Sequence, residues 1–456
     1  IRQNKFTQTE LHQSTQEVKN TYRDTVPLAG LEHRNLHSET NALVSPQKSD
    51  VRKEENKVET LPFCHLHTHT QFSILQSTIS IPKLVQEAVS MNMPAVAITD
   101  LGNLMGAFHF VKAVNKHNET LEHGVGNSIK AIIGITINIC ANHLDRSHRD
   151  DGFQIVLIAK NKNGYHNLAK LSSIAHTKGF YYVPRIDRDL MLKYKEDIIV
   201  LTGNLYGEVP RKILNIGAKQ AEDSLLWWKE HFGTDLYIEL MRHDQEDETR
   251  VNTSLVELAR KHSVKIVASN SCYYLKKEEA NAHDILLCVK DGEKQSTPIG
   301  RGRGYRYGLP NQEYYFKSPQ EMNQLFSDIP EAIQNIQELI EKIESFALER
   351  DVLLPKFDIP QEFVVSEDQD DGGKRGENAY LRHLALEGAK SRYGELTKEI
   401  QERIDFELSV IENTGYPGYF LIVQDLIAAA RSLDVSVGPG RGSAAGSVVA
   451  YCLQIT

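Results

Sequence analysis

The sequence predicts an α/β domain built on parallel strands, followed by a helical region. Seven short apolar runs, several rich in β-branched residues, recur between residues 63 and 269. Helical patterns lie between most of these runs, which is the order expected of parallel strands joined by helices. The strand signal fades after about residue 320, where apolar residues recur at helical spacing.

Composition places the chain among soluble globular proteins. Its 456 residues are 40% hydrophobic and 25% charged, enough for two or three domains. No run has the length of a membrane span, and nothing resembles a secretory signal. The five cysteines are scattered without a CxxC pair, which argues against a disulfide framework or zinc ribbon and predicts a cytoplasmic location. The net charge of -9 does not favour nucleic-acid binding overall, although a local basic groove stays compatible with it.

The first sixty residues differ in character from the rest. They are polar, poor in aromatic residues and without apolar periodicity, so 1–60 is predicted to be a disordered linker. The first residue is Ile1 rather than Met, which predicts an internal fragment or a processed chain.

The predicted strands are apolar almost throughout, as expected of strands buried on both faces. They are 63–66, 95–99, 131–137, 155–159, 198–202, 236–240 and 265–269. Helices are predicted between them, for example over 82–93 and 252–262. A closed barrel and an open doubly wound sheet both fit this pattern.

The C-terminal part is predicted to be helical. Over 329–346 the residues Ile333, Ile336, Ile340 and Ile343 share one helical face. Over 396–415 the stripe consists of Leu396, Ile400, Ile404, Leu408 and Ile411, and Gly415 is placed to end the helix. The acidic, glycine-containing stretch 366–378 is predicted to be an exposed loop.

A histidine cluster ends the first predicted strand. "HLHTHT" contains His65, His67 and His69, and alternation along an extended segment puts all three on one side. One interpretation is a histidine-rich strand end without metal. The other makes His67 and His69 two ligands of a metal centre at the C-terminal face of a barrel, where α/β barrels place their chemistry.

Several stretches resemble a known family. "HLHTHTQFSILQST", "MPAVAITDLGNLMGAFHF", "GYHNLAKLSS" and "YIELMRH" are similar to the polymerase-and-histidinol-phosphatase (PHP) domain of bacterial C-family replicative DNA polymerases. "ENTGYPGYFLIVQDLI" and "VSVGPGRGSAAGSVVAYCLQIT" are similar to the start of the palm domain of the same family. The resemblance implies a seven-stranded (β/α) PHP barrel over 61–350 with connecting helices. It also implies the N-terminal part of a nucleotidyltransferase-type α+β palm over 351–456.

The resemblance implies that the PHP metal site is degenerate in this chain. His67 and His69 match the family's His-x-His pair, and Asp100 is kept beside a lost ligand. The positions without a ligating side chain are Gln76, Leu101, Thr136, Gln154, Asn204, Ser271 and Tyr273. Amide and leucine side chains cannot replace anionic or imidazole ligands, so the barrel is predicted to be metal-free and structural. The alternatives are one weakly bound ion on His67, His69 and another acid, or a metal-dependent phosphoesterase or 3′–5′ exonuclease.

A basic loop lies at 300–308. It combines Arg301, Arg303 and Arg306 with two tyrosines, and arginine interleaved with aromatic residues can bind phosphates and stack on bases. Such a run also suits a solvated turn between domains. Both interpretations stay open.

The glycine-rich loop "GPGRGSAAGS" (438–447) has the composition of a phosphate cradle. It is not a Walker loop, because no lysine follows its glycines. The glycines Gly438, Gly440 and Gly442 allow backbone N–H groups to approach an anion, and Arg441, Ser443 and Ser447 add a charge and hydroxyls. The alternative is a structural turn with helix-capping serines.

The resemblance assigns this loop to the triphosphate of an incoming deoxynucleotide, with Gly440, Arg441, Gly442, Ser443 and Ser447 as the phosphate-binding residues. The family's catalytic aspartates, which bind Mg²⁺, lie downstream of the loop, and no Asp or Glu follows Gly438 here. No catalytic residue and no bound cofactor are therefore predicted in this fragment. For the whole polymerase the implied partners are primer-template DNA, a deoxynucleotide, a sliding clamp, and a proofreading exonuclease subunit or fused exonuclease domain, with no membrane.

Overall fold

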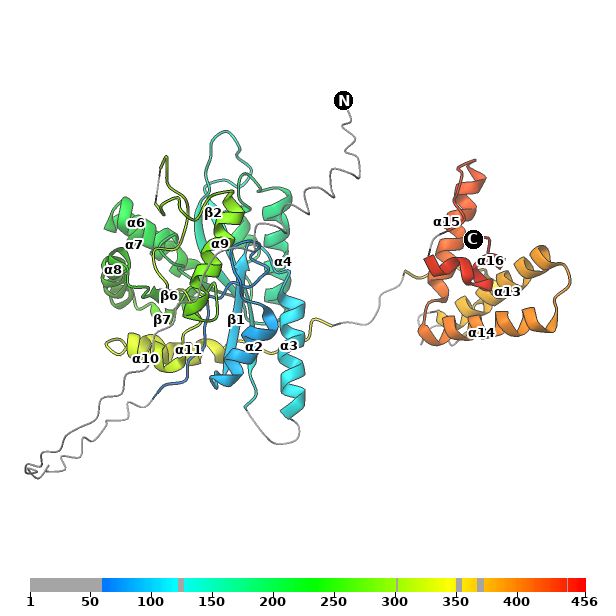
Figure 1. The fold of residues 1–456 in the computed structure, drawn as a ribbon, viewed down its shortest axis with the longest axis horizontal. Helices are drawn as coiled ribbons and strands as arrows, with labels where there is room; N and C mark the ends of the chain where they lie inside the picture. The colour runs from blue at the N-terminus through cyan, green and yellow to red at the C-terminus, as the bar shows by residue number, and fades with distance from the viewer. Residues whose placement is uncertain (1–59, 122–126, 301, 350–354, 367–372, 441) are drawn as a thin grey trace, which may run out of the picture. The chain divides into compact units, whose positions relative to one another are not determined.

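The computed structural model describes residues 60–121, 127–300, 302–349, 355–366, 373–440 and 442–456. Buried apolar side chains form one hydrophobic core within 61–348 and another within 357–455. The first core belongs to an α/β domain and the second to a helical region (Figure 1). The predicted linker lies, apart from Thr60, outside the described residues, and the predicted boundary at residue 350 falls on a position that is not described.

Six of the seven predicted strands are confirmed, and with β4 they form one sheet. The strands are β1 (Ala95–Leu101), β2 (Lys130–Cys140), β3 (Phe153–Ala159), β4 (Arg185–Asp187), β5 (Ile198–Leu201), β6 (Leu236–Met241) and β7 (Lys265–Ser269). Their order is β1-β2-β3-β5-β6-β7, and β4 pairs with β2. The apolar pattern misses β4 because its three residues contain a single apolar side chain, Ile186.

The sheet is mixed rather than wholly parallel, which corrects the sequence prediction. β3 runs antiparallel to both of its neighbours, β2 and β5, whereas β1–β2, β5–β6 and β6–β7 are parallel. The reason lies in the connection 141–152, which contains no helix. Parallel neighbours need a long crossover connection, whereas an antiparallel pair can be joined by a loop.

The segment 63–70 lies between the two ends of the sheet and closes it. Its backbone accepts hydrogen bonds from Ala97 and Thr99 of β1, at 3.1 and 2.8 Å. On its other side it exchanges two bonds with Cys272, just after β7, and Thr68 forms an isolated bridge there. The strand predicted at 63–66 is therefore an extended closing segment, and the sheet forms a closed ring.

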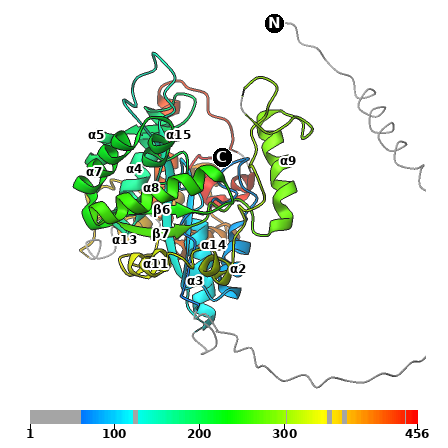
Figure 2. The same ribbon diagram turned by 90° about the vertical axis from the view of Figure 1, so that its left-hand side faces the viewer.

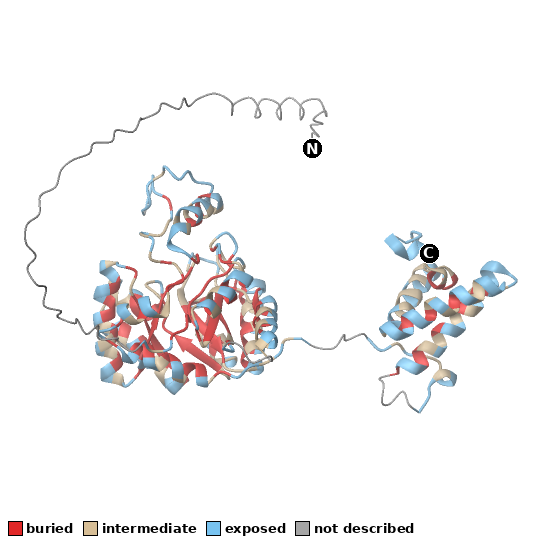
Figure 3. Ribbon diagram, turned by 60° about the horizontal axis from the view of Figure 1, so that its bottom comes forward, coloured by how far each residue is buried: buried red, intermediate tan, exposed pale blue. Residues whose placement is uncertain are grey.

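Helices cover the outside of this ring, and their inner faces are buried (Figure 3). They are α2 (Ile81–Ser90), α3 (Ala107–Thr120), α4 (Lys162–Thr177), α5 (Arg188–Lys193), α6 (Glu208–Asn215), α7 (Ala218–Phe232), α8 (Glu246–His262), α10 (Pro319–Leu325) and α11 (Glu331–Glu341). The helix α9 (Ala280–Asp291) lies to one side of them (Figure 2). Short 3₁₀ turns are η2 (Gly233–Asp235) and η3 (Lys277–Glu279). None of the helices in the described ranges is long and apolar enough to cross a membrane.

The predicted helices are confirmed in this domain. The ranges 82–93 and 252–262 fall on α2 and the C-terminal part of α8. The isoleucine face of 329–346 belongs to α11, and Ile343 is buried just beyond its end. All five cysteines are free and buried.

The C-terminal region is helical in its described residues. Its elements are η4 (Gln361–Phe363), α13 (Lys374–Tyr393), α14 (Lys398–Thr414), α15 (Pro417–Ser432), η5 (Gly442–Gly446) and α16 (Val448–Cys452). Of the predicted stripe, Ile404, Leu408 and Ile411 are buried, and Gly415 ends α14 with a φ of 75°. Between residues 355 and 456 the described part contains no strand, so this portion of the predicted α+β palm contributes helices.

The predicted loop 366–378 is wrong over its last residues. α13 already begins at Lys374, and Glu377 is buried. Its carboxylate accepts a 2.9 Å hydrogen bond from the backbone N–H of Phe357, which offsets part of the cost of burying it. Residues 367–372 lie outside the described ranges.

Candidate functional site

The closing segment brings two of the predicted histidines together. His67 and His69 are buried, and their ring centroids lie 5.1 Å apart, because alternate residues of an extended segment share a side. His65 is engaged elsewhere: its Nε2 lies 2.8 Å from the carbonyl oxygen of Lys317, and its ring packs against Phe316. Burial lowers the pKa of His65 to about 3. The candidate pair is therefore His67 and His69.

His67 is paired with an acid that the sequence analysis did not single out. Its Nδ1 lies 3.0 Å from Oε1 of Glu239, which is buried on β6. The other ring nitrogen lies 3.5 Å from the hydroxyl of Thr136, which donates to the carbonyl oxygen of Thr99 at 2.9 Å. The sequence signal for Glu239 was an acid inside an apolar strand, "LYIEL", since buried carboxylates are rare unless paired.

His69 has unused hydrogen-bonding capacity. Neither of its ring nitrogens has a partner among the described residues, and the same is true of Oε2 of Glu239. The ring of His69 stacks on Tyr273, with centroids 4.5 Å apart. Burial, together with the neighbouring His67, lowers the pKa of His69 well below its usual value. His69 is therefore a neutral imidazole at physiological pH.

Asp100 holds the loop that follows the histidines. Its carboxylate accepts hydrogen bonds from the backbone N–H of Thr70 at 2.6 Å, the hydroxyl of Thr70 at 2.8 Å and the hydroxyl of Ser73 at 2.7 Å. Burial raises the pKa of Asp100, and these donors oppose that effect. Its neighbour Leu101 donates its backbone N–H to the hydroxyl of Ser73 at 3.1 Å. Both residues thus fasten the loop to the end of β1.

Two positions where the family resemblance implies a lost metal ligand, Gln154 on β3 and Asn204 after β5, lie at a backbone contact between these segments. The N–H of Gln154 donates to the carbonyl oxygen of Tyr206 at 2.9 Å, and Gln154 forms a bridge with Gly207. Asn204 accepts a 2.9 Å bond from the N–H of Tyr206 through its side-chain oxygen. Asn204 therefore shapes the turn 204–207 that lies against β3.

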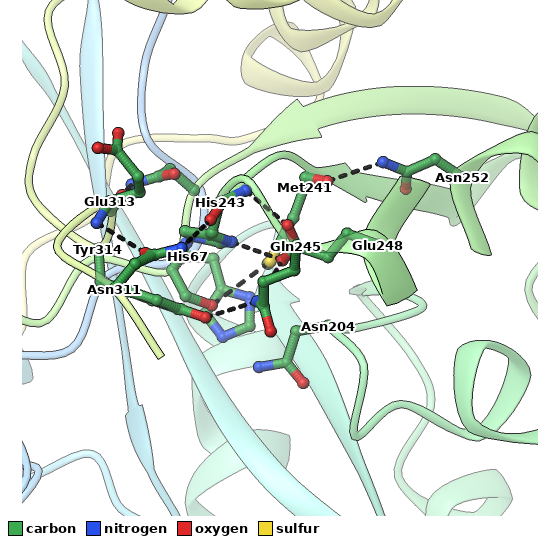
Figure 4. A network of polar contacts seen from close by, with 12 residues as sticks. His67, Asn204, Met241, His243, Gln245, Glu248, Asn252, Asn311, Glu313 and Tyr314 are labelled. Atoms are coloured by element: carbon green, nitrogen blue, oxygen red, sulfur yellow. Dashed lines mark hydrogen bonds and ion pairs between the residues drawn. The ribbon is translucent and has the colours of Figure 1, made fainter. Parts of the chain in front are cut away.

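Ser271 belongs to a buried network around His243, another residue that the sequence analysis did not assign. Figure 4 shows this network, with His243, Glu248 and Tyr314 labelled. The ring of His243 has Nδ1 2.7 Å from Glu248 and accepts a 3.2 Å bond from the N–H of Ser271 at Nε2. The ring also stacks on Tyr314, with centroids 4.1 Å apart. Both nitrogens of His243 are thus used within the protein.

Gln76, another position where the resemblance implies a lost metal ligand, makes its contact through its backbone. Its carbonyl oxygen lies 2.9 Å from Nε2 of His283, which ties the loop 73–77 to α9. The structure therefore brings His67, His69, Thr136 and Tyr273 together, and it uses Asp100, Gln154, Asn204 and Ser271 to hold loops.

These residues do not fit a polynuclear metal site. Within the described ranges, no group of three or more His, Cys, Asp or Glu side chains is arranged to hold a metal ion. The carboxylate of Asp100 is taken up by three protein donors, and the hydroxyls and amides at the other positions are weak ligands for a transition metal. No reaction step through a metal can be derived from this set.

The glycine-rich loop is exposed, and two of its glycines have left-handed backbone. Gly440 and Gly442 have φ values of 87° and 66°, which glycine adopts at little cost. A Cβ built on Gly438, Gly442 or Gly446 would meet no described atom within 4 Å. The loop therefore leaves its backbone accessible. The predicted Arg441 lies outside the described residues.

Ser447 ends this loop and is engaged within the protein. Its hydroxyl accepts the N–H of Ala450 at 3.1 Å, which caps α16, and donates to Oε2 of Glu407 at 2.8 Å. The same carboxylate oxygen accepts the N–H of Val449 at 3.0 Å. Ser447 therefore performs the capping role that the structural interpretation predicts.

One of the three arginines of the basic loop, Arg306, is not available to bind a phosphate. Arg306 is buried and forms a bidentate ion pair with Asp284 of α9, at 2.6 and 2.8 Å. Neither nucleic-acid binding nor a solvated turn describes this residue. Arg303 and Tyr305 are exposed, and Arg301 is not described.

Comparison with known proteins matches two segments of the chain to families. Residues 65–243 match the PHP domain, and residues 379–456 match the bacterial DNA polymerase III alpha NTPase domain. The DNA polymerase III subunit alpha of Borreliella burgdorferi is 40% identical over 399 residues, which are 86% of this chain and 32% of the relative. That of Treponema pallidum is 36% identical over 401 residues, which are 87% of this chain and 32% of the relative. The chain thus spans about a third of the length of these relatives.

Proposed function

This chain carries the PHP domain and NTPase-domain sequence of bacterial DNA polymerase III alpha subunits, and we propose that the protein adds deoxynucleotides to a primer 3′ end. The observation that carries this proposal is the exposed glycine-rich loop within the segment that matches the NTPase domain. A nucleotidyltransferase needs such a site to hold the triphosphate of the incoming nucleotide against the primer end.

The loop is proposed to bind the triphosphate through backbone and hydroxyl donors. Gly440 and Gly442 turn the backbone sharply, so that N–H groups of the loop can approach an anion without side-chain interference. The exposed hydroxyl of Ser443 adds a donor, and Arg441 adds a positive charge. These contacts would hold and orient the nucleotide.

Magnesium ions would stabilise the developing charge of the transferred phosphoryl group in the whole polymerase. Carboxylates are the ligands that Mg²⁺ prefers; the family resemblance implies that the catalytic ones lie downstream of the glycine-rich loop, and no Asp or Glu follows Gly438 in this sequence. We therefore propose that the 456-residue chain binds nucleotide without extending a primer, and that primer-template DNA is the partner of the whole protein.

Ser443→Ala is expected to weaken binding of dATP by roughly tenfold, because a hydrogen bond to a charged phosphate contributes about 1.5 kcal/mol. Calorimetric titration of the purified chain with dATP measures the affinity, and a primer-extension assay on the same sample should give no product. Ser432→Ala is the control, since that hydroxyl donates only to Ala429 within α15 among the described residues. Equal affinities for the parent and Ser443→Ala, or measurable extension, would contradict the proposal.

The PHP barrel is proposed to be a metal-free scaffold. The carboxylate of Asp100 supports this role, because its three hydrogen bonds to Thr70 and Ser73 hold the loop after the histidines. The pairing of His67 with Glu239 likewise ties the closing segment to β6 across the ring. We propose that this scaffold docks a proofreading exonuclease subunit. A sliding clamp would bind elsewhere on the whole polymerase, which is proposed to act in the cytoplasm.

Elemental analysis tests the metal-free proposal directly. The chain purified without chelator, and again after incubation with Zn²⁺ or Mn²⁺ and desalting, is expected to hold well under one metal ion per molecule. Stoichiometric retention of either metal would overturn the proposal.

One observation favours a second candidate, a single ion on the pair of histidines. Among the described residues the ring nitrogens of His69 and Oε2 of Glu239 have no hydrogen-bond partner, and both side chains contact His67, so an added ion could use them as ligands. Imidazole and carboxylate are suitable ligands for zinc. If the parent retains zinc in the elemental analysis and His69→Ala does not, this candidate replaces the metal-free scaffold.

A further inference from the structure

We propose that Glu407 is a positioning residue for nucleotide binding, because it anchors the C-terminal end of the glycine-rich loop. The inference rests on the proposed function, since it takes the loop 438–446 to hold the triphosphate. In this inference Ser447 belongs to the anchor and is no longer one of the phosphate-binding residues.

The contacts of Glu407 join α14 to the end of the loop. Its carboxylate oxygen Oε2 accepts hydrogen bonds from the hydroxyl of Ser447 at 2.8 Å and the N–H of Val449 at 3.0 Å. The side chain of Glu407 is 11% exposed, so water competes little for these bonds. One carboxylate oxygen, forty residues away in sequence, thus fixes both the last loop residue and the first turn of α16.

Arg403 holds the other carboxylate oxygen. Its Nε lies 2.8 Å and its Nη2 2.7 Å from Oε1, one turn away on α14. Burial alone would raise the pKa of Glu407, but the donors Val449, Ser447 and Arg403 outweigh it, and the pKa is lowered. The carboxylate is therefore ionised at neutral pH, and charge-assisted hydrogen bonds are stronger than neutral ones.

The anchor orients a Ser447 hydroxyl that a phosphate would otherwise use. A hydroxyl has one hydrogen to donate, and in Ser447 it points to Glu407 while the oxygen accepts from Ala450. Ser443 lies in η5, four residues before this fixed point, and is exposed. Removing the anchor would release the end of the loop, so binding would have to order it again at an entropic cost.

Glu407→Ala, Glu407→Gln and Asp405→Ala in the 456-residue chain test this inference. Asp405 is a matched control two residues away on α14, where it forms an ion pair with Arg382 and none with the described residues of the loop. Hydrogen exchange of the segment 442–456 without nucleotide reports the anchor, and titration with dATP reports the effect on binding. Exchange over 381–389 of α13 checks that the helical core stays folded.

Glu407→Ala is expected to speed exchange at Val449 and Ala450 and to weaken dATP binding, each by about tenfold, for the loss of charged hydrogen bonds. Glu407→Gln keeps one acceptor and should recover part of both effects, and Asp405→Ala should match the parent. Unchanged exchange in Glu407→Ala overturns the anchor. Faster exchange with unchanged dATP affinity overturns the positioning role. A parent chain that binds no dATP instead refutes the proposed triphosphate site, and the exchange data then decide the anchor alone.

Discussion

Replacing Asp100 by alanine is expected to lower the free energy of unfolding of the α/β domain by about 3 kcal/mol. The substitution leaves the N–H and hydroxyl of Thr70 and the hydroxyl of Ser73 without their acceptor. Thr70 and Ser73 are buried, and a buried donor without an acceptor lowers the free energy of unfolding by the cost of its desolvation. Urea denaturation of the purified chain, followed by the fluorescence of Trp227 and Trp228 in α7, measures the change.

The same experiment separates a structural Asp100 from a metal ligand. Asp223→Ala is the control: this exposed residue of α7 pairs with Lys219, and its loss should stay within about 0.5 kcal/mol of the parent. Asp100→Asn keeps one acceptor oxygen and should lie between the two. If Asp100→Ala keeps the stability of the parent and the parent alone retains metal, the scaffold role assigned to Asp100 is wrong.

Gly388→Ala is expected to detach α16 from α13 and to abolish measurable dATP binding. A Cβ at this position would lie 2.7 Å from the carbonyl carbon of Cys452 and closer still to its oxygen. Glycine to alanine inside a helix usually stabilises it by about 1 kcal/mol, so the expected sign is the reverse of the ordinary one. Overpacking of this kind costs about 1–3 kcal/mol, and it acts on the helix that carries Val449.

Hydrogen exchange over 448–456 and titration with dATP measure the effect of Gly388→Ala. Glu387→Ala is the matched control, because this neighbouring side chain is exposed and, among the described residues, forms an ion pair with Lys390 alone. Protection of α16 equal to that of the parent would show that α13 and α16 can move apart without loss. The close approach at Gly388 would then have no role in holding the loop.

Local pattern was sufficient for much of the fold. The strands β1 to β3 and β5 to β7 are runs in which almost every side chain is buried, so apolar composition alone identifies them. The isoleucines of α11 and the stripe of α14 follow from the helical period. The antiparallel direction of β3 could not be predicted in this way. It depends on the connection after residue 140, and apolar periodicity contains no information on strand direction.

The site divides in the same way. The proximity of His67 and His69 could be predicted, since alternate residues of an extended segment share a side. The same rule placed His65 with them, and there the structure corrects it, because His65 bonds to the carbonyl oxygen of Lys317. Glu239 and Glu407 could not be predicted, because they lie 172 and 40 residues from His67 and Ser447, and only folding brings them within hydrogen-bond distance. For a similar reason the sequence did not predict the ion pair of Arg306, because its partner Asp284 lies on α9.

The sequence by itself therefore determined six of the strands, the helices α2, α8, α11 and α14, and the glycine-rich loop. Each of these depends on residue types at short spacing, which a linear pattern contains. Only the tertiary structure decided what the polar side chains do. It assigned Asp100 to a loop and Ser447 to Glu407, because a buried polar atom bonds to whichever donor or acceptor the fold places within about 3 Å.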